Sequence, residues 1–348
     1  MLQRCGCFII PKDVLDRLAN DKKLSAETRK SFADTSSLES SWRKLRDAHV
    51  AATLARGPML ASMGMAATLA PAPKILVYTC SNTTSLPGTP VANPGSSADD
   101  TVKRAHDLTK SVAEFYQKVL GRNSIDNAGM SLLSNVHYGV GYNNAFWDGA
   151  QMTYGDGDGQ IFIDFTKSSD VVAHELTHGV TQYTAGLNYT NEAGGLNESC
   201  SDVIGSMFRQ WLLGQDVTQA DWLIGGEIMG ATATQRGFTC LRDMADPGAA
   251  HCLAPQPKHY SQYVPGSDPH ESSGIPNHAF YLAAMALGGK SWEKLGPVWY
   301  AALNTPRPKR SMRFRTFASR AKSAARRLYR SEPAVYAAVV AGWSGVGL

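Results

Sequence analysis

The chain has 348 residues, of which 43% are hydrophobic and 18% charged, and it carries a net charge of +4. These proportions are typical of a folded globular protein, and they exclude a disordered chain and an integral membrane protein. The net charge is too small to indicate a nucleic-acid partner by itself. At this length we expect a large core divided between two lobes, with an additional segment.

Two apolar runs lie in the first 73 residues, and neither resembles a targeting or membrane segment. Phe8–Ile10 is only three residues long, far shorter than the core of a signal peptide. The run 56–73 is bounded by prolines and is too short and too interrupted to cross a membrane. We therefore expect no membrane partner. The protein should be cytoplasmic or, as we prefer, secreted by a route without a recognisable signal peptide.

The middle of the chain has the pattern of a mixed lobe. Residues 101–120 carry apolar side chains at helical spacing. The composition of strands is found at residues 75–78, 134–140, 151–154 and 161–165. Because helical patterns dominate after residue 197, we predict an α+β fold. A β-rich N-terminal lobe should precede a mainly helical C-terminal lobe.

The stretch 171–178, VVAHELTH, points to chemistry. Two histidines four residues apart, His174 and His178, share one helical face and can hold one Zn²⁺. Glu175 would lie beside a zinc-bound water and could take its proton as a general base. The alternative is a pair of core histidines on an ordinary helix. Burying two imidazoles and a carboxylate is unfavourable unless they bind something, so we favour the zinc site.

A third ligand is expected a short distance downstream, in the stretch AGGLNESCSD at 193–202. Its glycines indicate a loop, and a helix is expected from Asn197 onward. Glu198 and Asp202 are four residues apart and would share a helical face. Glu198 could complete a site of two histidines and one glutamate, while Asp202 could hydrogen-bond a ligand histidine. Taken alone, such a carboxylate pair is more often a solvated helix face.

Several stretches in order resemble the thermolysin family of zinc metallopeptidases, and within it the protealysin-like branch with a short propeptide. The matching stretches are YNNAFWDG at 142–149, YGDGDG at 154–159, the histidine helix, GLNESCSD at 195–202 and SGIPN at 273–277. The resemblance implies a two-lobe fold with one catalytic zinc between the lobes. It divides the chain into a propeptide at 1–55, an N-terminal lobe at 56–185 and a C-terminal lobe at 186–348.

By this resemblance, residues 1–55 would inhibit the enzyme as its own propeptide, and the precursor would be a zymogen. A simple N-terminal helical cap is the alternative. Cys5 and Cys7 lie in this segment, and a thiolate is a strong zinc ligand, so one of them could block the open zinc position. Two N-terminal thiols without such a role are an equally good interpretation.

The resemblance also assigns residues that would contact a substrate. Ala145 and Trp147 would offer main-chain groups and Asn144 its amide, along an edge strand that pairs with the peptide. Tyr189 and His270 would stabilise the oxyanion, with Asp268 orienting His270. Arg242 would hold a substrate carbonyl near the first primed subsite. The loop before His270 departs from the family pattern at Pro269 and Glu271, which places this histidine in more doubt than the zinc ligands.

Specificity and calcium binding are two further implications. The resemblance implies an apolar first primed subsite, and hence cleavage on the amino side of bulky hydrophobic residues. The residues that would line it are Phe162, Phe165, Val171, Ile224 and Leu241. Asp170 matches a family calcium ligand, but the acidic positions expected near it are Arg209, Leu223 and Gly226. We predict that the double calcium site is absent and that Arg209 replaces the cation.

The sequence therefore predicts a zinc-dependent endopeptidase that acts on proteins and peptides, and we expect a monomer. One rival is an inactive homologue that only binds peptides. Another is a nucleic-acid-binding module that uses the basic stretch 307–330, but apolar residues at helix-core spacing favour a solvated helix face, so no nucleic-acid partner is expected. Cys240 and Cys252 are close enough in sequence to form a disulfide, which spacing alone does not show.

Overall fold

The computed structural model describes residues 6–54, 72–305 and 307–348. Its helices are α1 (Lys12–Ala19), α2 (Ala26–Leu54), α3 (Asp100–Leu120), α4 (Ser169–Tyr183), α5 (Asn191–Leu213), α6 (Ala231–Gln235), α7 (Pro269–Ser272), α8 (Gly274–Leu287), α9 (Leu295–Leu303), α10 (Phe314–Leu328) and α11 (Pro333–Gly345). Its strands are β1 (Cys7–Phe8), β2 (Ile75–Thr79), β3 (Thr89–Pro90), β4 (Leu132–Val136), β5 (Ala145–Trp147), β6 (Met152–Tyr154), β7 (Leu223–Ile224) and β8 (Arg242–Asp243). Cys5 and the boundary between residues 55 and 56 lie outside the described residues.

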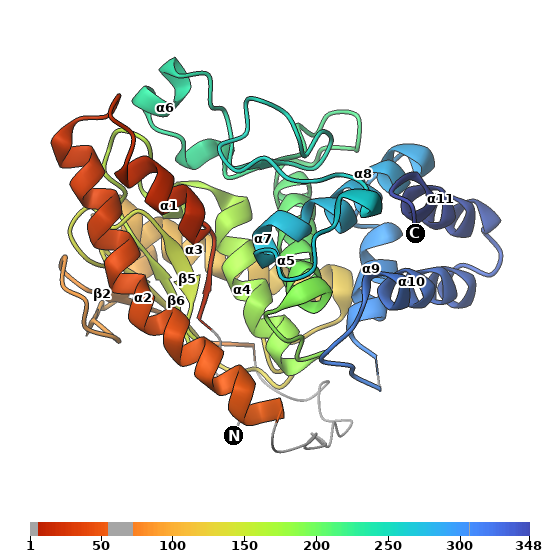
Figure 1. Ribbon diagram of the computed structural model, residues 1–348. Coiled ribbons are helices and arrows are strands. Elements are labelled where there is room, and N and C mark those ends of the chain that lie inside the picture. Colours follow the sequence, from red (N-terminus) through yellow and green to blue (C-terminus); the bar gives the residue numbers. More distant parts are fainter. Residues whose placement is uncertain (1–5, 55–71, 306) are drawn as a thin grey trace.

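The predicted α+β division is confirmed. A six-stranded sheet in the order β1-β5-β6-β4-β2-β3 forms the first lobe, and α8–α11 form most of the second (Figure 1). The helices α4 and α5 pack against each other between the two lobes (Figure 1). Among the described residues, none of the helices combines the length and apolar character that a membrane span requires.

Two of the predicted strands need correction. The strand expected at 134–140 is β4, which begins at Leu132 and ends at Val136 because His137 takes a positive φ of 54°. Residues 161–165 form no strand: Phe162 makes only an isolated bridge with Met229. Asp164 then caps a short 3₁₀ helix by accepting a hydrogen bond from the Thr166 amide.

The helix expected from Asn197 begins six residues earlier, at Asn191, so the glycines predicted as a loop lie inside α5. Glycine is needed at these positions because a side chain would clash with α7. A Cβ atom on Gly194 would lie 2.7 Å from the Pro269 ring, and one on Gly195 would lie 2.4 Å from the Ser272 hydroxyl. The glycines therefore let α7 approach α5 and do not break the helix.

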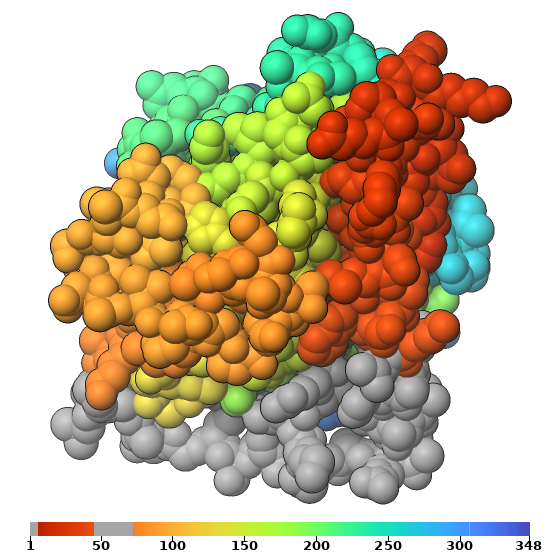
Figure 2. Space-filling model, turned by 90° about the vertical axis from the view of Figure 1, so that its left-hand side faces the viewer, coloured from red at the N-terminus to blue at the C-terminus, as the bar shows by residue number. Residues whose placement is uncertain are grey.

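The N-terminal segment is part of the folded core. Helices α1 and α2 pack on each other, with Leu15, Leu18 and Phe32 buried. In Figure 2 these red N-terminal residues lie against the yellow and yellow-green residues of the first lobe. Strand β1 pairs antiparallel with β5, so the N-terminal segment supplies one edge of the sheet. This arrangement covers β5, the edge strand that the sequence assigned to substrate.

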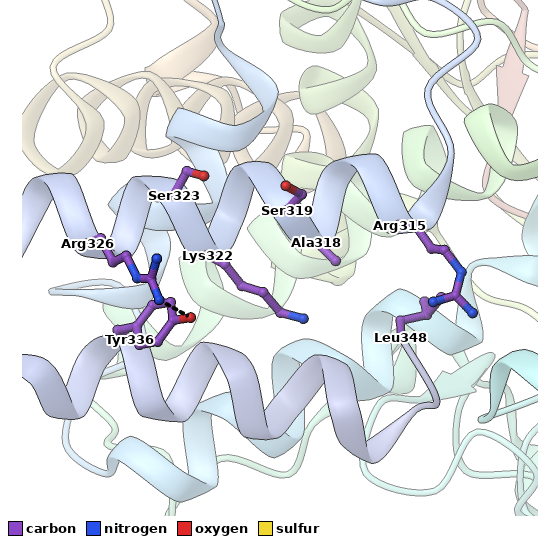
Figure 3. A pocket seen from close by; sticks show the side chains of 8 residues that line it. All are labelled: Arg315, Ala318, Ser319, Lys322, Ser323, Arg326, Tyr336 and Leu348. Carbon is purple, nitrogen blue, oxygen red and sulfur yellow. Dashed lines mark hydrogen bonds between the residues drawn. The ribbon is translucent and has the colours of Figure 1, made fainter.

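The basic stretch in the second lobe forms a helix with an apolar inner face, as its spacing predicts. In α10 the buried residues are Phe314, Phe317, Ala318, Ala321, Ala324 and Ala325. Between α10 and α11 the cationic side chains of Arg315, Lys322 and Arg326 line a surface groove of about 380 Å³ (Figure 3). Arg326 donates a 2.6 Å hydrogen bond to Tyr336 across this groove. The expectation of no nucleic-acid partner stays a prediction.

Arg209 of α5 lies close to three acidic residues, Asp170, Asp221 and Glu227. It donates two hydrogen bonds from one nitrogen to Asp221, at 2.6 and 2.7 Å, and its second nitrogen lies 3.8 Å from Glu227. Asp170 is buried and accepts hydrogen bonds from Ser168 and from the Gly225 amide. Burial raises the pKa of Asp170, and Ser168 and the charge of Arg209 oppose this shift.

We predict that calcium at about 10 mM raises the melting temperature by less than about 1 °C, because Arg209 already supplies the positive charge. Replacing Arg209 with alanine should lower the free energy of unfolding by roughly 1–3 kcal/mol, since Asp170 would stay buried without this charge. Thermal unfolding with and without calcium measures both effects. Lys103→Ala is the control, because its ion pair with Asp107 is exposed and should contribute little. A calcium-dependent rise of many degrees would contradict the prediction.

Candidate active site

The predicted histidine pair lies on α4, and its two rings meet nearly at right angles, with their centroids 4.6 Å apart. Residues 169–181 of this helix are all buried, which places the polar side chains of the motif inside the molecule. The Nε2 atoms of His174 and His178 are 3.0 Å apart. Since α4 packs against α5, the histidines point at the next helix and not at solvent. The four-residue spacing thus produces the shared face that the sequence predicts.

Glu198 on α5 completes the cluster. Its carboxylate oxygens lie 3.3 Å from Nε2 of His174 and 3.6 Å from Nε2 of His178, and all three side chains are fully buried. The three potential ligand atoms lie within 4.8 Å of one another. The structure therefore brings together the two histidines and the glutamate that the sequence singles out.

The outer nitrogen of each histidine ring already has a partner. Nδ1 of His174 lies 2.9 Å from Asp202, and Nδ1 of His178 lies 2.9 Å from the side-chain oxygen of Asn197. Such contacts fix the ring orientation and leave Nε2 available for a metal. Asp202 was predicted in this position. Asn197 was missed, although a ligand histidine generally needs a partner for its second nitrogen and Asn197 lies within the quoted motif.

These residues fit a zinc ion. Two imidazole nitrogens and a carboxylate oxygen form the donor set of a catalytic zinc site. Glu198 Oε2 is buried and has no hydrogen-bond donor among the described residues, although unpaired buried polar atoms are unfavourable. A cation held between the two Nε2 atoms and Glu198 would satisfy all three ligands.

The charges around the cluster suit a cation as well. Burial lowers the pKa of His178 to about 4, which leaves its ring neutral. Burial opposes ionisation of Glu198, but the charge of the nearby His270 and the contact with His174 hold the pKa of that carboxyl well below its usual value. Burial is likewise outweighed at Asp202, where Arg242 and His174 lower the pKa to about 2. At His174, burial is outweighed by the hydrogen bonds and charges of Asp202 and Glu198, which raise the pKa to about 9, so this ring would release a proton on binding a metal. Neutral imidazole and ionised carboxylates are the forms that bind metal.

Glu175 lies on the same helix but has a different environment. Neither oxygen of its carboxylate accepts a well-formed hydrogen bond from the described residues, and both are buried. Burial is the main reason that the pKa of Glu175 is raised to about 8. A buried carboxyl beside a potential metal site, with both oxygens available, has the position and the proton affinity of a general base.

Tyr189 and His270 meet on the other side of Glu198. The Tyr189 hydroxyl contacts Glu198 and lies 3.3 Å from Nε2 of His270, and that nitrogen is 3.5 Å from Glu198. Asp268 lies 2.6 Å from Nδ1 of His270 and also caps α7 by accepting from the His270 amide. Pro269 occupies the first turn of α7, where proline is tolerated. The unusual loop therefore still brings His270 to the cluster.

Arg242 connects the cluster to the neighbouring strand β8. Its guanidinium donates two hydrogen bonds to Asp202, at 2.9 and 2.7 Å, and both residues are buried. Asn277 donates to the same carboxylate at 2.8 Å. The sequence assigned Arg242 to substrate binding, and its contact with the residue behind His174 was not foreseen.

The N-terminal segment occupies the groove along β5. The Ile9 amide donates to the carbonyl of Ala145 at 3.1 Å. Asn144 exchanges two hydrogen bonds with the backbone of Ile10, accepting at 2.9 Å and donating at 3.1 Å. Cys7 pairs with Trp147 in the ladder between β1 and β5. The groups of β5 that the sequence assigned to a peptide substrate thus bind the protein's own chain.

The carbonyl groups of this segment contact the two remaining site residues. The carbonyl oxygen of Phe8 lies 2.5 Å from Nε2 of His270, and that of Ile9 accepts from Arg242 at 3.1 Å. Cys7 is not among the residues that contribute a potential ligand atom to the cluster of His174, His178 and Glu198. The structure thus gives no support to a zinc-blocking thiolate at Cys7, and Cys5 lies outside the described residues.

The residues assigned to the first primed subsite are all fully buried. They belong to the same hydrophobic cluster as Ile9, and they are Phe162, Phe165, Val171, Ile224 and Leu241. The ring of Phe32, from α2, packs edge-on against Phe162 at 5.9 Å between centroids. The N-terminal segment therefore contributes apolar side chains to the cluster that contains the predicted pocket.

Comparisons with known proteins agree with this geometry. The thermolysin metallopeptidase catalytic domain matches residues 64–182, and the thermolysin metallopeptidase alpha-helical domain matches residues 185–348. An extracellular metalloprotease of Pectobacterium carotovorum subsp. carotovorum is 49% identical over 63% of this chain and 65% of its own length, slightly less than two thirds. Protease PrtS of a Photorhabdus species is 40% identical over 78% of this chain and 76% of its own length.

A solved structure extends the similarity to the N-terminal segment. The precursor of protealysin, a metalloproteinase from Serratia proteamaculans, is 36% identical and superimposes with a TM-score of 0.82. The match covers 98% of this chain and 99% of that precursor. Together with the two domain matches, which span more than half of the chain, it shows that the chain belongs to the thermolysin family of metallopeptidases, in its protealysin-like branch.

Proposed function

We propose that this protein is a zinc-dependent endopeptidase made as a zymogen, and that residues 6–54 hold it inactive. The observation that supports this most strongly is the contact of Phe8 and Ile9 with His270 and Arg242, beside the cluster of His174, His178 and Glu198. A segment that only capped the fold would have no need to bind these groups. We place the end of the inhibitory segment near residue 55.

Each residue of the site has a role in peptide hydrolysis. His174, His178 and Glu198 would hold the zinc, which when bound supplies a Lewis acid and lowers the pKa of water. Glu175 takes a proton from the attacking water and passes it to the leaving amine. Tyr189 and His270 donate hydrogen bonds to the oxygen on which negative charge develops. Asp268 keeps the His270 ring oriented toward that oxygen.

Substrate is held by the groups that now hold the N-terminal segment. Ala145 and Trp147 would pair with the peptide backbone and Asn144 would bind it through its amide, as in β-strand addition. Arg242 would hold the carbonyl that follows the cleaved bond. By these contacts the Phe8–Ile9 bond takes the place of the cleaved bond, so Ile9 corresponds to the first residue after it. An apolar Ile9 side chain supports cleavage before bulky hydrophobic residues.

We also propose a location, an oligomeric state and a catalytic role over a purely binding one. A protease of this kind would act on proteins and peptides outside the cell, and we propose secretion because one of the relatives described above is an extracellular metalloprotease. A monomer is proposed, since the site is built from one chain. The rival of an inactive peptide-binding homologue is disfavoured by Glu175, whose buried carboxylate accepts no well-formed hydrogen bond from the described residues.

We predict that Glu175→Gln lowers the rate of peptide cleavage by at least about 10³-fold, because the amide cannot accept the proton of water. The zinc content should stay near one ion per chain, since Glu175 is not among the three ligands. Cleavage of a peptide library read by mass spectrometry, together with metal analysis, measures both quantities. The products of the unaltered enzyme should begin with large apolar residues.

The matched control for this experiment is Glu114→Gln on α3, where the carboxylate is exposed and lies in an ordinary helical ion pair. It should cleave at the unaltered rate. Activity retained in Glu175→Gln would remove Glu175 from the mechanism. Cleavage that persists after zinc is removed with a chelator would overturn the zinc assignment as a whole.

The inhibitory segment is anchored by a buried ion pair on α2. Glu39 and Arg43 are both buried and hydrogen-bonded to each other. Glu39 also accepts hydrogen bonds from Asn144 at 2.7 Å and from Tyr142 at 3.0 Å. The guanidinium of Arg43 lies 4.4 Å from the centre of the Phe8 ring. The pair therefore connects α2 to Asn144, which hydrogen-bonds the backbone of Ile10 and so holds the inhibitory segment beside β5.

We predict that Arg43→Ala speeds removal of the N-terminal segment from the precursor by at least about tenfold, because it leaves Glu39 buried without its cation. Conversion of purified precursor over time, followed by electrophoresis and N-terminal mass determination, gives the rate. Lys44→Ala is the matched control, since Lys44 is the exposed neighbour on the same helix. Equal conversion rates for the two variants would show that this ion pair does not hold the segment in place.

A further inference from the structure

A pair of buried cysteines lies beside the active site and has no part in the proposed mechanism. Cys240 and Cys252 are almost fully buried, and their sulfur atoms are 3.7 Å apart. Their backbones are directly opposite each other in an isolated parallel bridge. The amide of Thr239 donates to His251, and that of Leu253 donates to Cys240, so hydrogen bonds flank the pair on both sides. The two side chains are thus held in contact by the fold.

The segment between these cysteines carries residues of the active site. Leu241 and Arg242 follow Cys240 directly, and the Arg242 side chain binds both Asp202 and the carbonyl of Ile9. At the other end, the carbonyl of Leu253 accepts a hydrogen bond from Arg17 of the inhibitory segment. A link between Cys240 and Cys252 would therefore close a loop whose two ends both contact that segment.

We propose that Cys240 and Cys252 form a disulfide that fixes the position of Leu241 and Arg242 at the substrate groove. In this reaction each thiol loses its proton, and the pair gives two electrons to a small disulfide such as oxidised glutathione. One sulfur–sulfur bond forms within the protein, the bond of the oxidant breaks, and two small thiols are released. Such a bond persists in an oxidising compartment outside the cytosol.

A metal site made from the same cysteines is the main alternative. His251 adds a third potential ligand atom within 4.8 Å of the two sulfurs. Structural zinc sites, however, are closed by four ligands, and this cluster has three among the described residues. The ring of His251 is partly exposed and lies 3.1 Å from Asp243, which already gives it a partner. The two facing sulfurs need only each other, so we favour the disulfide.

The burial of the pair indicates when the bond forms. Contact with Cys252, together with burial, raises the pKa of the Cys240 thiol, so the folded pair contains little thiolate. Exchange starts from a thiolate, and buried thiols react slowly. The bond should therefore form during folding or while the loop is transiently open, and it should resist small reductants afterwards.

Peptide mapping tests the bond directly and does not depend on activity. Full-length protein is incubated in a glutathione redox buffer, unfolded, alkylated and digested with trypsin without reduction. We expect one cross-linked product of peptides 237–242 and 243–258, each of which contains a single cysteine. Cys200, a buried thiol on α5, should be alkylated in the same sample and serves as the internal reference.

A stability measurement tests the structural role. A phosphine reductant, applied during unfolding and refolding, should lower the melting temperature of the unaltered protein by about 5 °C, as expected for opening a loop of this size. The double variant Cys240→Ser, Cys252→Ser should show no dependence on reductant. Cys80→Ser, which removes a buried thiol elsewhere, should keep the full dependence. In the matured enzyme, reduction should raise KM about two- to fivefold and change kcat less, because Arg242 binds substrate away from the reacting atoms.

Three outcomes would overturn the proposal. Separate alkylation of both cysteines after oxidation would show two ordinary core thiols. A second zinc ion per chain that disappears in the double serine variant would assign the cluster to a metal. A cross-link from Cys240 to any cysteine other than Cys252 would show that the pairing is wrong.

Discussion

The structure depends on how it compensates buried charge between α4 and α5. Glu198 and Asp202 are buried with Arg242, which compensates one of their two negative charges, and against the effect of burial these two carboxylates raise the pKa of His174 to about 9. Uncompensated buried charge is strongly unfavourable. One divalent cation between His174, His178 and Glu198 would balance it. Metal binding and the packing of these two helices are therefore one requirement, because the polar cluster that binds the ion also forms the interior of the helix pair.

Arg242 extends this requirement to the substrate groove. Its guanidinium binds Asp202, which orients His174, and the same group binds the carbonyl of Ile9. The groove and the cluster thus share the Arg242 side chain. A shift of the groove backbone would therefore move the partner of Asp202, and a shift of Asp202 would move the group that binds in the groove. The N-terminal segment uses this connection, since its Phe8 and Ile9 carbonyl groups contact His270 and Arg242.

The parts of the fold that follow from local pattern were predictable, and those that follow from tertiary contact were not. The histidine helix has a clear period, and the structure places His174 and His178 on one buried face beside Glu198, as predicted. Gly194 and Gly195 were expected in a loop because glycine is unfavourable inside a helix. They lie inside α5 because α7 packs against them, and the sequence does not show this tertiary contact. Residues 161–165 have strand composition but lack a neighbouring strand to pair with. The pairing of Glu39 with Asn144 joins residues 105 positions apart, so no local signal could have revealed it.

The position of the inhibitory segment also resolves a problem of sheet architecture. Without β1, strand β5 would be an exposed edge, and exposed edges pair readily with other chains. A peptidase needs that edge free for substrate, but a newly folded precursor does not. Covering β5 with β1 protects the edge and blocks the groove by the same backbone hydrogen bonds. Under the proposed function, removal of the segment would expose the sheet edge and free the groove in one step, and it would break the contacts of Arg17 on α1 with Leu253 and of Glu39 on α2 with Asn144.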